Sequence, residues 1–511
     1  MLRAQGYSFV PPNASVYADI DLLASAGLID TVATAVRPYT RAEIARLLAE
    51  ARRNIATRTG NMTWAQRLID RDLARYVTVA RGVNYVAMDV AAMDSPARPV
   101  PSDFNGSMDA SVNPLAAWRG GRSVANGETV SLETMHTMDL GRHLTIAVSP
   151  RFSGDHRRSG GDGASARLQT ANLSMSFGNL VAEIGRDYAM FGPAPTGGLL
   201  LSANAPSLDM LRIATRRPAA LPWLFRHLGP ANGTLLIADL GTDHQIHPHA
   251  KLVGYHMGIA PHPNVELGVE VIDETGGRGA PPASLADRIL DAIPPIDAWR
   301  TGSDFQFSNK LAGVDARWRI PSWAGLELYL EGVVDDMDIR RLRSSLLDDG
   351  GVIGGISLAC LVECGRLAAR FEYHQTGIRY YTHTDFASGI EAQRIMLGDP
   401  LGPRGLGGYA TVESRAGAGG TFAITGGYEV RSGNRYGSAG NGSHSANFHF
   451  VQIEHRPGEH RRRLVSTWTG PMAGGRADLI VSAGVERTTN FNFNGGSRTG
   501  AIAQIGYRLW P

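Results

Sequence analysis

The spacing of apolar residues along the chain changes once, near residue 80. Before that point apolar residues recur every three to four positions, which is the pattern of amphipathic helices. Thr40 with Glu43 and Thr63 with Gln66 each have the spacing of a capping box, where two of these helices would begin. Helices this short are marginal on their own. We therefore predict that residues 1–80 form a small helical bundle whose apolar faces cover each other or dock onto a larger body.

From about residue 81 apolar and polar residues alternate with a period of two, in stretches of roughly 8 to 12 residues that continue to the end of the chain. In HLTIAVSPRF, for example, Leu144, Ile146 and Val148 share one face. Strands of this length cross a bilayer at a tilt. The segment 445–456 is predicted to be one of these strands. The segment 210–240 fits the pattern least, because the stretch RRPAALPWLFRHLGPANG within it is too long for a periplasmic turn.

The connections between these strands alternate between short and long. Short connections lie near residues 140–143, 178, 261, 321, 363 and 417, and long ones at 154–165, 189–209, 273–307, 335–351, 377–407 and 431–445. A soluble sandwich has both ends in the same water, whereas the two rims of an outer-membrane barrel face different compartments. About 19 strands can be counted, and bacterial single-chain barrels have even numbers. The pattern predicts a mainly β protein, in which residues 81–511 form a transmembrane antiparallel β-barrel of about 18 strands and the small N-terminal α-helical bundle precedes it.

Composition agrees with a strand-rich protein and adds one peculiarity of charge. A net charge of +2 over 511 residues gives no reason to expect a nucleic-acid partner. Lys251 and Lys310 are the only lysines, so arginine supplies nearly all of the positive charge, which suits an anionic ligand. No run of about 20 apolar residues occurs.

The first and last residues of the sequence give conflicting indications about export to the outer membrane. The opening residues MLRAQGYSFVPP do not have the pattern of an export signal. The last stretch, AIAQIGYRLWP, alternates and closes on Trp510 and Pro511, much as outer-membrane barrels end with an aromatic residue. We therefore expect that the sequence begins after or inside an export signal.

Four stretches in collinear order resemble the Wzi-type capsule assembly proteins of the Gram-negative outer membrane. They are VYADIDLLASAGLID followed by RPYTRAEIARLLAEA, then EIGRDYAMFGPAPTGGLLLSANAPSLDMLRI, then YYTHTDFASGI with LGDPLGPRGLGGY, and the final strand. The chain departs from the family pattern at Phe191, where tryptophan is usual, and at Gly198, where serine is usual. The resemblance implies an 18-stranded outer-membrane barrel blocked to free diffusion, a periplasmic helical bundle, and a role in holding capsular or related extracellular polysaccharide on the cell surface.

The resemblance also implies a place for the stretch FGPAPTGGLLLSANAP. It would be a proline-stiffened loop that leaves a strand near Tyr188 and folds back, with its leucines packed in the lumen or against a neighbouring loop. The predicted lumen-loop residues are Phe191, Gly192, Pro193, Leu199, Leu200, Leu201 and Asn204. An ordinary surface loop with an apolar tip is the alternative.

Polysaccharide contacts are predicted in the long connections, where arginines and aromatic residues gather. Guanidinium groups pair with uronate carboxylates or phosphates, and aromatic faces suit the apolar faces of sugar rings. The candidates are Arg157, Arg158, Arg340, Arg341, Arg343, Arg379, Tyr380, Tyr381, His383, Arg394, Arg404, Arg435 and Tyr436. Each exposed contact contributes little, so attachment would depend on many contacts along a repeating polymer. The alternative is that these arginines only solvate the rim, or pair with lipid phosphates and nearby aspartates.

Other candidate chemistry is weaker. His244, His247 and His249 are spaced like metal ligands but lack a carboxylate or cysteine nearby, so we predict no metal and no cofactor. Cys360 and Cys364 flank a predicted tight turn, and whether they are bridged stays open. The sequence shows neither a nucleophile elbow nor a helical zinc motif, and we predict that the protein is not an enzyme.

These patterns lead to one main hypothesis and two alternatives. The expected partners are capsular or extracellular polysaccharide and outer-membrane lipid, with the polysaccharide export machinery as a further candidate. A porin-like channel for polysaccharide or small solutes would instead need an open lumen, and a barrel-embedded hydrolase would need residues that meet only in space.

Overall fold

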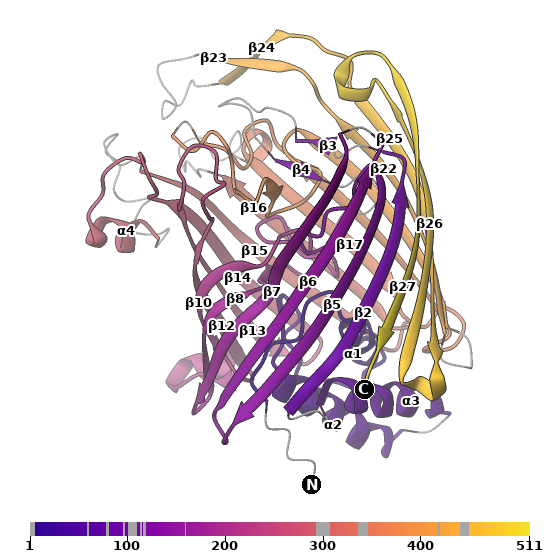
Figure 1. Cartoon of the computed structure of the whole chain (residues 1–511). Helices are drawn as coiled ribbons and strands as arrows, with labels where there is room; N and C mark the ends of the chain where they lie inside the picture. Colours follow the sequence, from indigo (N-terminus) through magenta and orange to yellow (C-terminus); the bar gives the residue numbers. More distant parts are fainter. Residues whose placement is uncertain are drawn as a thin grey trace.

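The protein is a closed antiparallel barrel with a helical bundle at one end, as the computed structural model shows (Figure 1). Residues 6–58, 61–77, 81–95, 98–100, 110–112, 115, 119–158, 160–292, 307–335, 346–383, 385–415, 420–439 and 449–511 are described. The predicted barrel of about 18 strands is confirmed, since 18 long strands form the closed wall. Each strand pairs with its neighbour in the chain, and the first strand pairs with the last between Val86 and Leu509.

The barrel strands are β2 (Arg81–Met93), β5 (Gly127–Leu140), β6 (Leu144–Arg157), β7 (Asp162–Phe177), β8 (Leu180–Asp187), β10 (Leu208–Thr215), β12 (Pro230–Asp239), β13 (Lys251–His262), β14 (Val265–Thr275), β15 (Ser308–Ile320), β16 (Leu326–Asp335), β17 (Gly350–Leu358), β18 (Leu367–Thr376), β21 (Gly405–Arg415), β22 (Thr421–Arg431), β25 (Glu459–Met472), β26 (Ala477–Thr489) and β27 (Ser497–Leu509). Short strands are β1 (Val36–Arg37), β3 (Arg98–Pro99), β4 (Ser111–Val112), β9 (Met190–Phe191), β11 (Ala219–Ala220), β19 (Glu391–Ala392), β20 (Ile395–Met396), β23 (Arg435–Ala439) and β24 (His449–Glu454). The helices are α1 (Val16–Ser25), α2 (Arg41–Ile55), α3 (Thr63–Asp72) with the π-helical turn η1 (Leu73–Val77), α4 (Leu285–Asp291), and the 3₁₀ turns η2 (Trp223–Leu228), η4 (Ala473–Gly475) and η5 (Phe491–Phe493).

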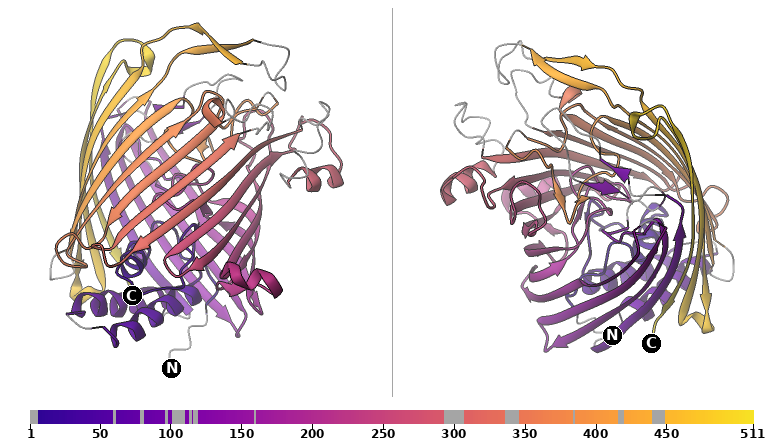
Figure 2. Two further views of the ribbon diagram at one scale, coloured as in Figure 1. Left: turned by 180° about the vertical axis from the view of Figure 1, so that it is seen from behind. Right: turned by 45° about the horizontal axis from the view of Figure 1, so that its top comes forward.

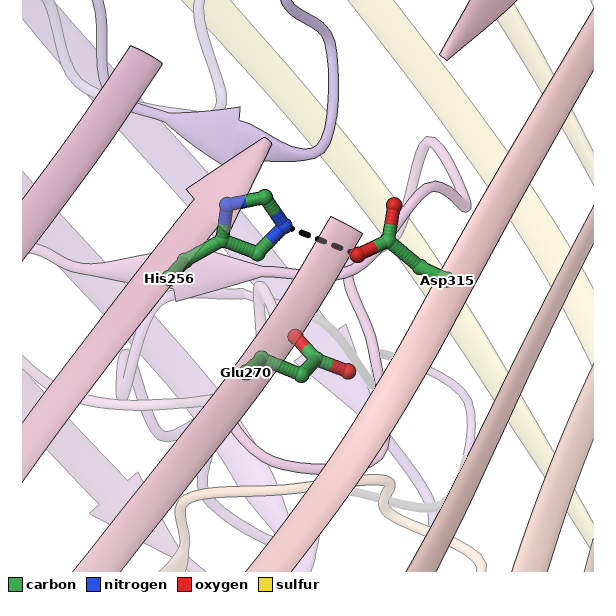
Figure 3. Close-up of side chains that lie close together, drawn as sticks. All are labelled: His256, Glu270 and Asp315. Carbon is green, nitrogen blue, oxygen red and sulfur yellow. Dashed lines mark hydrogen bonds and ion pairs between the residues drawn. The ribbon is translucent and has the colours of Figure 1, made fainter. Parts of the chain in front are cut away.

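The wall of the barrel has apolar side chains outside and polar ones inside. On β16, Leu330 is 54% exposed on the outer face, whereas the next residue, Glu331, is fully buried on the lumen side. Strand β8 shows the same arrangement, because Glu183 points inward to Arg212 and Ile184 points outward. Further in, His256, Glu270 and Asp315 come together from three neighbouring strands (Figure 3). An apolar exterior with a polar interior is the pattern of a barrel immersed in lipid.

Short and long connections lie at opposite ends of the barrel, as predicted. The long ones, with the hairpin β23–β24 and helix α4, gather at the end opposite the bundle (Figures 1 and 2). One connection was predicted too long. Strands β6 and β7 continue to Arg157 and Asp162, so only four residues join them, because polar residues can extend a strand ladder beyond the apolar band.

Two further strand predictions need correction. In the segment 445–456, residues 445–448 lie outside the described residues. The described part does not enter the wall, since β24 pairs with β23. The wall strand is instead β25, whose arginines at 461–463 hid its alternation because several of them face the lumen. In 210–240, β10 and β12 are both wall strands, and the connection that joins them holds η2 at the bundle end of the barrel (Figure 1).

Helices α1, α2 and α3 form the bundle, and a buried apolar cluster joins them to the barrel. The predicted cap of α2 is confirmed, since the Thr40 hydroxyl accepts a hydrogen bond from the Glu43 amide at 3.1 Å. The cap predicted at Thr63 is wrong. Thr63 is the first helical residue of α3, and its amide donates to the Asn61 side chain at 3.1 Å. In the part of the chain that is described, no helix is long and apolar enough to cross a membrane.

The bundle is tied to the barrel by buried ion pairs and by the end of the last strand. Arg75 pairs with Asp478 at 2.8 Å, and Asp19 pairs with Arg415 at 2.5 Å. Trp510 is buried with its ring centroid 5.0 Å from that of Tyr76 in the bundle and 5.7 Å from that of Tyr85 in β2. The bundle therefore contacts both the first and the last barrel strand.

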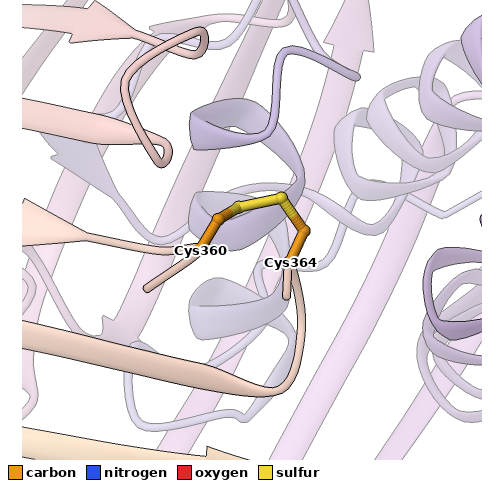
Figure 4. The surroundings of a disulfide bond; sticks show 2 residues. All are labelled: Cys360 and Cys364. Carbon is orange, nitrogen blue, oxygen red and sulfur yellow. A yellow bond between two sulfur atoms is a disulfide. The ribbon is translucent and has the colours of Figure 1, made fainter. Parts of the chain in front are cut away.

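The turn between β17 and β18 contains a disulfide bond between Cys360 and Cys364 (Figure 4). This answers the question that the sequence left open. Cys360 packs with Leu22 of α1 and with Trp64 and Leu68 of α3. The bridged turn is therefore one of the surfaces on which the bundle sits.

Asp72 gives the bundle a dependence on pH. The side chain is fully buried, and burial together with the nearby Asp19 raises its pKa from 3.8 to about 8. Because the folded pKa lies above the unfolded one, the protonated carboxyl favours the folded state below about pH 4, and this contribution is lost as the pH rises through 8. We expect Asp72→Asn to stabilise the bundle at pH 8 by about 1 to 2 kcal/mol and to flatten its dependence on pH.

Thermal unfolding of the detergent-solubilised protein at pH 5 and pH 8 measures this effect. Asp70→Asn is the matched control, since Asp70 lies on the same helix with an exposed side chain. An Asp72→Asn variant that keeps the wild-type slope between the two pH values would contradict the prediction.

Candidate functional site: the filled lumen and the rim pocket

The loop between β8 and β10 folds back into the barrel. Leu199, Leu200 and Leu201 are fully buried, and they belong to one apolar cluster with Phe191 and residues of the barrel wall. The loop is held in a tight turn by hydrogen bonds from the Phe191 amide to the Leu201 carbonyl at 2.9 Å and from the Gly198 amide to the Phe191 carbonyl at 2.6 Å. The apolar tip thus lies in the lumen.

Glycine is required at two positions of this loop. Gly192 has a φ of 102°, and a Cβ atom there would lie 2.4 Å from the Gly198 Cα. A Cβ atom on Gly198 would lie 2.5 Å from both carboxylate oxygens of Glu331. Glu331 in turn accepts a hydrogen bond from the Leu199 amide at 2.6 Å. Gly198, at a position where serine is usual, therefore allows the loop to lie close to the barrel wall.

The connection between β18 and β21 also enters the lumen and binds the first loop. The Tyr381 hydroxyl donates to the Leu199 carbonyl at 2.6 Å. The Asn204 side chain donates to the Met396 carbonyl at 2.7 Å, and the Ser202 amide to the Leu397 carbonyl at 2.9 Å. We call the two segments, residues 188–207 and 377–404, the lumen plug.

Several of the predicted ligand residues lie in the lumen plug and are buried there. Tyr380 and Tyr381 are fully buried and His383 nearly so, and Arg379 is buried in an ion pair with Asp349 at 3.0 Å. These four side chains are therefore not exposed at the rim, and their predicted contact with polysaccharide stays a prediction. The buried apolar residues that follow in the same segment, Phe386, Ile390, Met396, Leu397 and Leu401, were the signal that this connection packs inside.

The other predicted ligand residues do not form one group. Arg157 and Arg158 are exposed at the tip of the β6–β7 hairpin, where Arg158 pairs with Asp94 at 3.0 Å. Arg394 is exposed in the turn between β19 and β20. Arg435 lies 3.4 Å from Glu454 on the β23–β24 hairpin. Arg340, Arg341 and Arg343 lie outside the described residues.

An open pocket of about 360 Å³ lies at the rim opposite the bundle. The ends of β18, β21 and β22 and the base of the β23–β24 hairpin form it, and we call it the rim pocket. Its polar and aromatic lining consists of Gln375, Thr376, Arg404, Arg431, Ser432, Asn434, Tyr436, His455 and Arg456. Among the described residues that line the pocket none is acidic. Arg404 and Tyr436 were predicted from the sequence, whereas His455 and Arg456 were missed because 445–456 was predicted to be a wall strand.

The arginines of the rim pocket differ in how firmly they are held. Arg431 is buried and pairs with Glu459 at 2.7 Å, so it belongs to the pocket wall. The Arg404 guanidinium donates to the Asn434 carbonyl. Arg456 is exposed and pairs with Glu454 at 2.6 Å, and this guanidinium lowers the pKa of Glu454. Because an exposed ion pair contributes little to stability, an anionic ligand can replace it.

The three histidines with metal-like spacing point to separate partners. His244 lies 2.8 Å from Glu274, and His249 lies 3.1 Å from Asp239. The His247 ring nitrogen is 2.7 Å from the Asp385 carbonyl oxygen. These three side chains therefore do not converge on one point.

Comparison with known proteins places the fold in a family. The model of the capsule assembly protein Wzi family matches residues 107–501. The chain belongs to the Wzi capsule assembly protein family. The solved structure of Wzi from Escherichia coli, described as an outer-membrane, carbohydrate-binding β-barrel involved in group 1 capsule assembly, has a TM-score of 0.68 at 19% identity and covers 98% of this chain and 99% of its own.

Two further proteins show partial or weaker similarity to this chain. A protein of the cps region of Klebsiella pneumoniae, called an uncharacterized 55.8 kDa protein, is 26% identical over 183 residues. That match spans about a third of this curated relative, 35% of its length. OccD3 (OpdP) from Pseudomonas aeruginosa has a TM-score of 0.42 at 10% identity and covers 84% of this chain and 91% of its own.

Proposed function

We propose that this Wzi family member is a non-catalytic outer-membrane barrel that anchors or organises exported capsular or extracellular polysaccharide at the cell surface. The observation that carries the proposal is the rim pocket, which offers arginines and an aromatic ring without a lining carboxylate. It opens at the end of the barrel with the long connections, which in outer-membrane barrels faces the cell exterior. The bundle would then face the periplasm.

The chemistry of the rim pocket suits an acidic polymer. Arg404 and Arg456 can each present a planar pair of donors to a uronate or phosphate group, and Tyr436 can stack on a sugar ring. The exposed Arg157, Arg158, Arg394 and Arg435 lie elsewhere on the rim or plug, and we propose that they add weaker contacts. A repeating polymer that touches several such points gains avidity without any strong single contact.

The filled lumen supports an anchor rather than a channel. Leucine side chains and two tyrosines that are fully buried occupy the space that a porin leaves to water. We expect the purified wild-type protein to show little or no single-channel conductance in a planar bilayer. A conductance typical of open porins would support the channel alternative instead.

A deletion strain of the natural host tests the proposal directly. Complementation with the wild-type protein should restore polymer to the cell surface, and the Arg404→Gln/Arg456→Gln double variant should leave most of it in the medium. The double variant keeps polar, hydrogen-bonding side chains and removes two charges, so we expect polymer affinity to fall at least about ten-fold.

Arg278→Gln/Arg487→Gln is the matched control, because both arginines are exposed outside the rim pocket. Surface polymer and the amount of barrel in the outer membrane are measured together. If the deletion strain retains its polymer, the proposed function fails. If the deletion releases polymer but the pocket variant holds it as well as the control does, the rim pocket is not the binding site.

A further inference from the structure

Four ionisable side chains meet on the inner wall of the barrel beneath the lumen plug. They are His256 on β13, Glu270 on β14, Asp315 on β15 and Glu331 on β16, one from each of four consecutive strands. The strand register brings them together, since His256 is opposite Glu270 and Asp315 is opposite Glu331. All four are buried, with exposures from 0 to 4%.

The donor atoms of this cluster are close and incompletely partnered. The His256 Nε2 atom lies 2.8 Å from the Asp315 Oδ2 atom, and the ligand atoms of His256, Glu270 and Asp315 all lie within 4.8 Å of one another (Figure 3). Glu270 is fully buried, and neither of its carboxylate oxygens receives a hydrogen bond from a nitrogen or hydroxyl donor. Its side-chain partner is the Glu331 carboxyl group, which is acidic as well. Glu331 Oε2 is also buried without such a donor. Within the described ranges this is the only group of three or more potential metal-binding side chains.

The backbone around the cluster leaves room for these groups. A Cβ atom on Gly268 would lie 2.0 Å from the Asp315 Oδ2 atom and 2.7 Å from the His256 Nε2 atom. Gly268 thus permits the contact between histidine and aspartate. On the plug side, a Cβ atom on Gly192 would lie 2.8 Å from the Glu331 carboxylate, and one on Gly198 would lie 2.5 Å from it.

The charges of the cluster do not balance among its own members. One imidazole faces three carboxyl groups, and Arg317, two residues after Asp315 on the same strand, is already bonded to Glu327 at 2.9 Å and to the Pro193 carbonyl. A buried carboxylate without a partner is costly, so either protons or a cation must neutralise the site. A fully buried carboxyl group that faces other carboxyl groups and receives no hydrogen bond from a nitrogen or hydroxyl donor favours a cation.

We propose that His256, Glu270 and Asp315, with Glu331 beside them, bind a divalent transition-metal ion. One imidazole nitrogen and two or three carboxylate oxygens suit Zn²⁺ or Mn²⁺, whereas Ca²⁺ prefers oxygen ligands alone. This revises the expectation from the sequence that no metal is bound. The ligands were missed there because they lie on four strands and do not form a short motif.

The metal ion also connects the wall to the lumen plug. Glu331 accepts the hydrogen bond of the Leu199 amide with one oxygen, and its other oxygen faces the cluster. An ion bound there would fix the position of this carboxylate and so hold its hydrogen bond with the Leu199 amide in place. Metal binding therefore stabilises the plug as well as the four strands.

The test uses the untagged full chain in detergent, stripped with EDTA and then dialysed against Zn²⁺ or Mn²⁺. We expect about one ion per chain by mass spectrometry of the metal content, and a melting temperature raised by at least about 3 °C. In Glu270→Gln and His256→Gln the bound metal should fall at least about five-fold. The matched control is His374→Gln, because His374 is another buried lumen histidine paired with an aspartate, Asp399, and lies outside this cluster.

Each outcome decides the proposal. Wild-type protein that takes up neither ion, or a Glu270→Gln variant that binds metal as well as His374→Gln does, overturns it. If the wild-type protein binds no metal and Glu270→Gln has a higher melting temperature, the carboxyl groups share protons instead, and the proposal is overturned. If the variants do not fold, Co²⁺ added to stripped wild-type protein gives the answer, since visible absorption of a four- or five-coordinate ion supports the site and its absence overturns it. Polymer retention is not a readout here, so this result is independent of the proposed function.

Discussion

Replacing Leu199, Leu200 and Leu201 together by serine should release the lumen plug while the barrel wall stays folded. Each leucine is fully buried in the cluster that fills the lumen, and its loss costs about 2 to 5 kcal/mol. The hydroxyl groups would also be buried without assured partners. The wall is held by its own continuous hydrogen-bond ladders, so the damage stays local.

Hydrogen exchange measured by mass spectrometry reports this change. We expect the protected amides of Phe191, Gly198 and Ser202 to exchange at least about a thousand-fold faster in the triple variant, while wall peptides keep their wild-type rates. Leu346→Ser/Leu347→Ser is the control, because these leucines are exposed at the rim. Unchanged protection of the plug in the triple variant would mean that the hydrogen bonds to the 377–404 segment hold it without the leucines.

Arg319→Ala should destabilise the junction of bundle and barrel far more than the substitution of an exposed arginine. Arg319 is almost fully buried near the bundle end of β15, where it lies 2.5 Å from Glu266 and 3.1 Å from Glu327. It also donates to the Thr34 hydroxyl in the bundle at 3.1 Å. Its removal leaves two buried carboxylates with fewer cationic partners, which costs about 3 to 5 kcal/mol.

A fall in melting temperature, together with faster protease cleavage between the helices, would show this loss. Arg366→Ala removes an arginine whose pair with Glu363 has both side chains more than 60% exposed, and it should cost less than about 1 kcal/mol. Equal melting temperatures for the two variants would contradict the prediction.

The sequence was sufficient for the architecture because the bilayer imposes a regular pattern. Alternation with period two and sorted connection lengths predicted the barrel, and helical periodicity predicted the bundle. Where the inner face carried charge, as on β25, the pattern was harder to recognise, because a lumen that pairs arginine with glutamate looks like a solvent-exposed face in the sequence.

The candidate site was only partly predictable, since a long connection can turn outward or inward. Tyr380 and Tyr381 looked like sugar-binding aromatics, yet the apolar residues that follow them draw the segment into the lumen. Arg404 and Tyr436 come together with Arg456 only because the β23–β24 hairpin folds over the rim. Such proximity depends on tertiary packing, which no local spacing encodes.

The position of Trp510 has a consequence for the order of folding. Its ring lies between Tyr76 and Tyr85, and the same buried cluster includes Met135 of β5 and Ala147 of β6. The barrel surface that the helices contact is therefore complete only after β2 and β27 have paired. Until then Trp510 stays accessible, and an unclosed barrel exposes an aromatic side chain that the finished molecule hides. We therefore infer that the helices dock late in folding, after the barrel has closed.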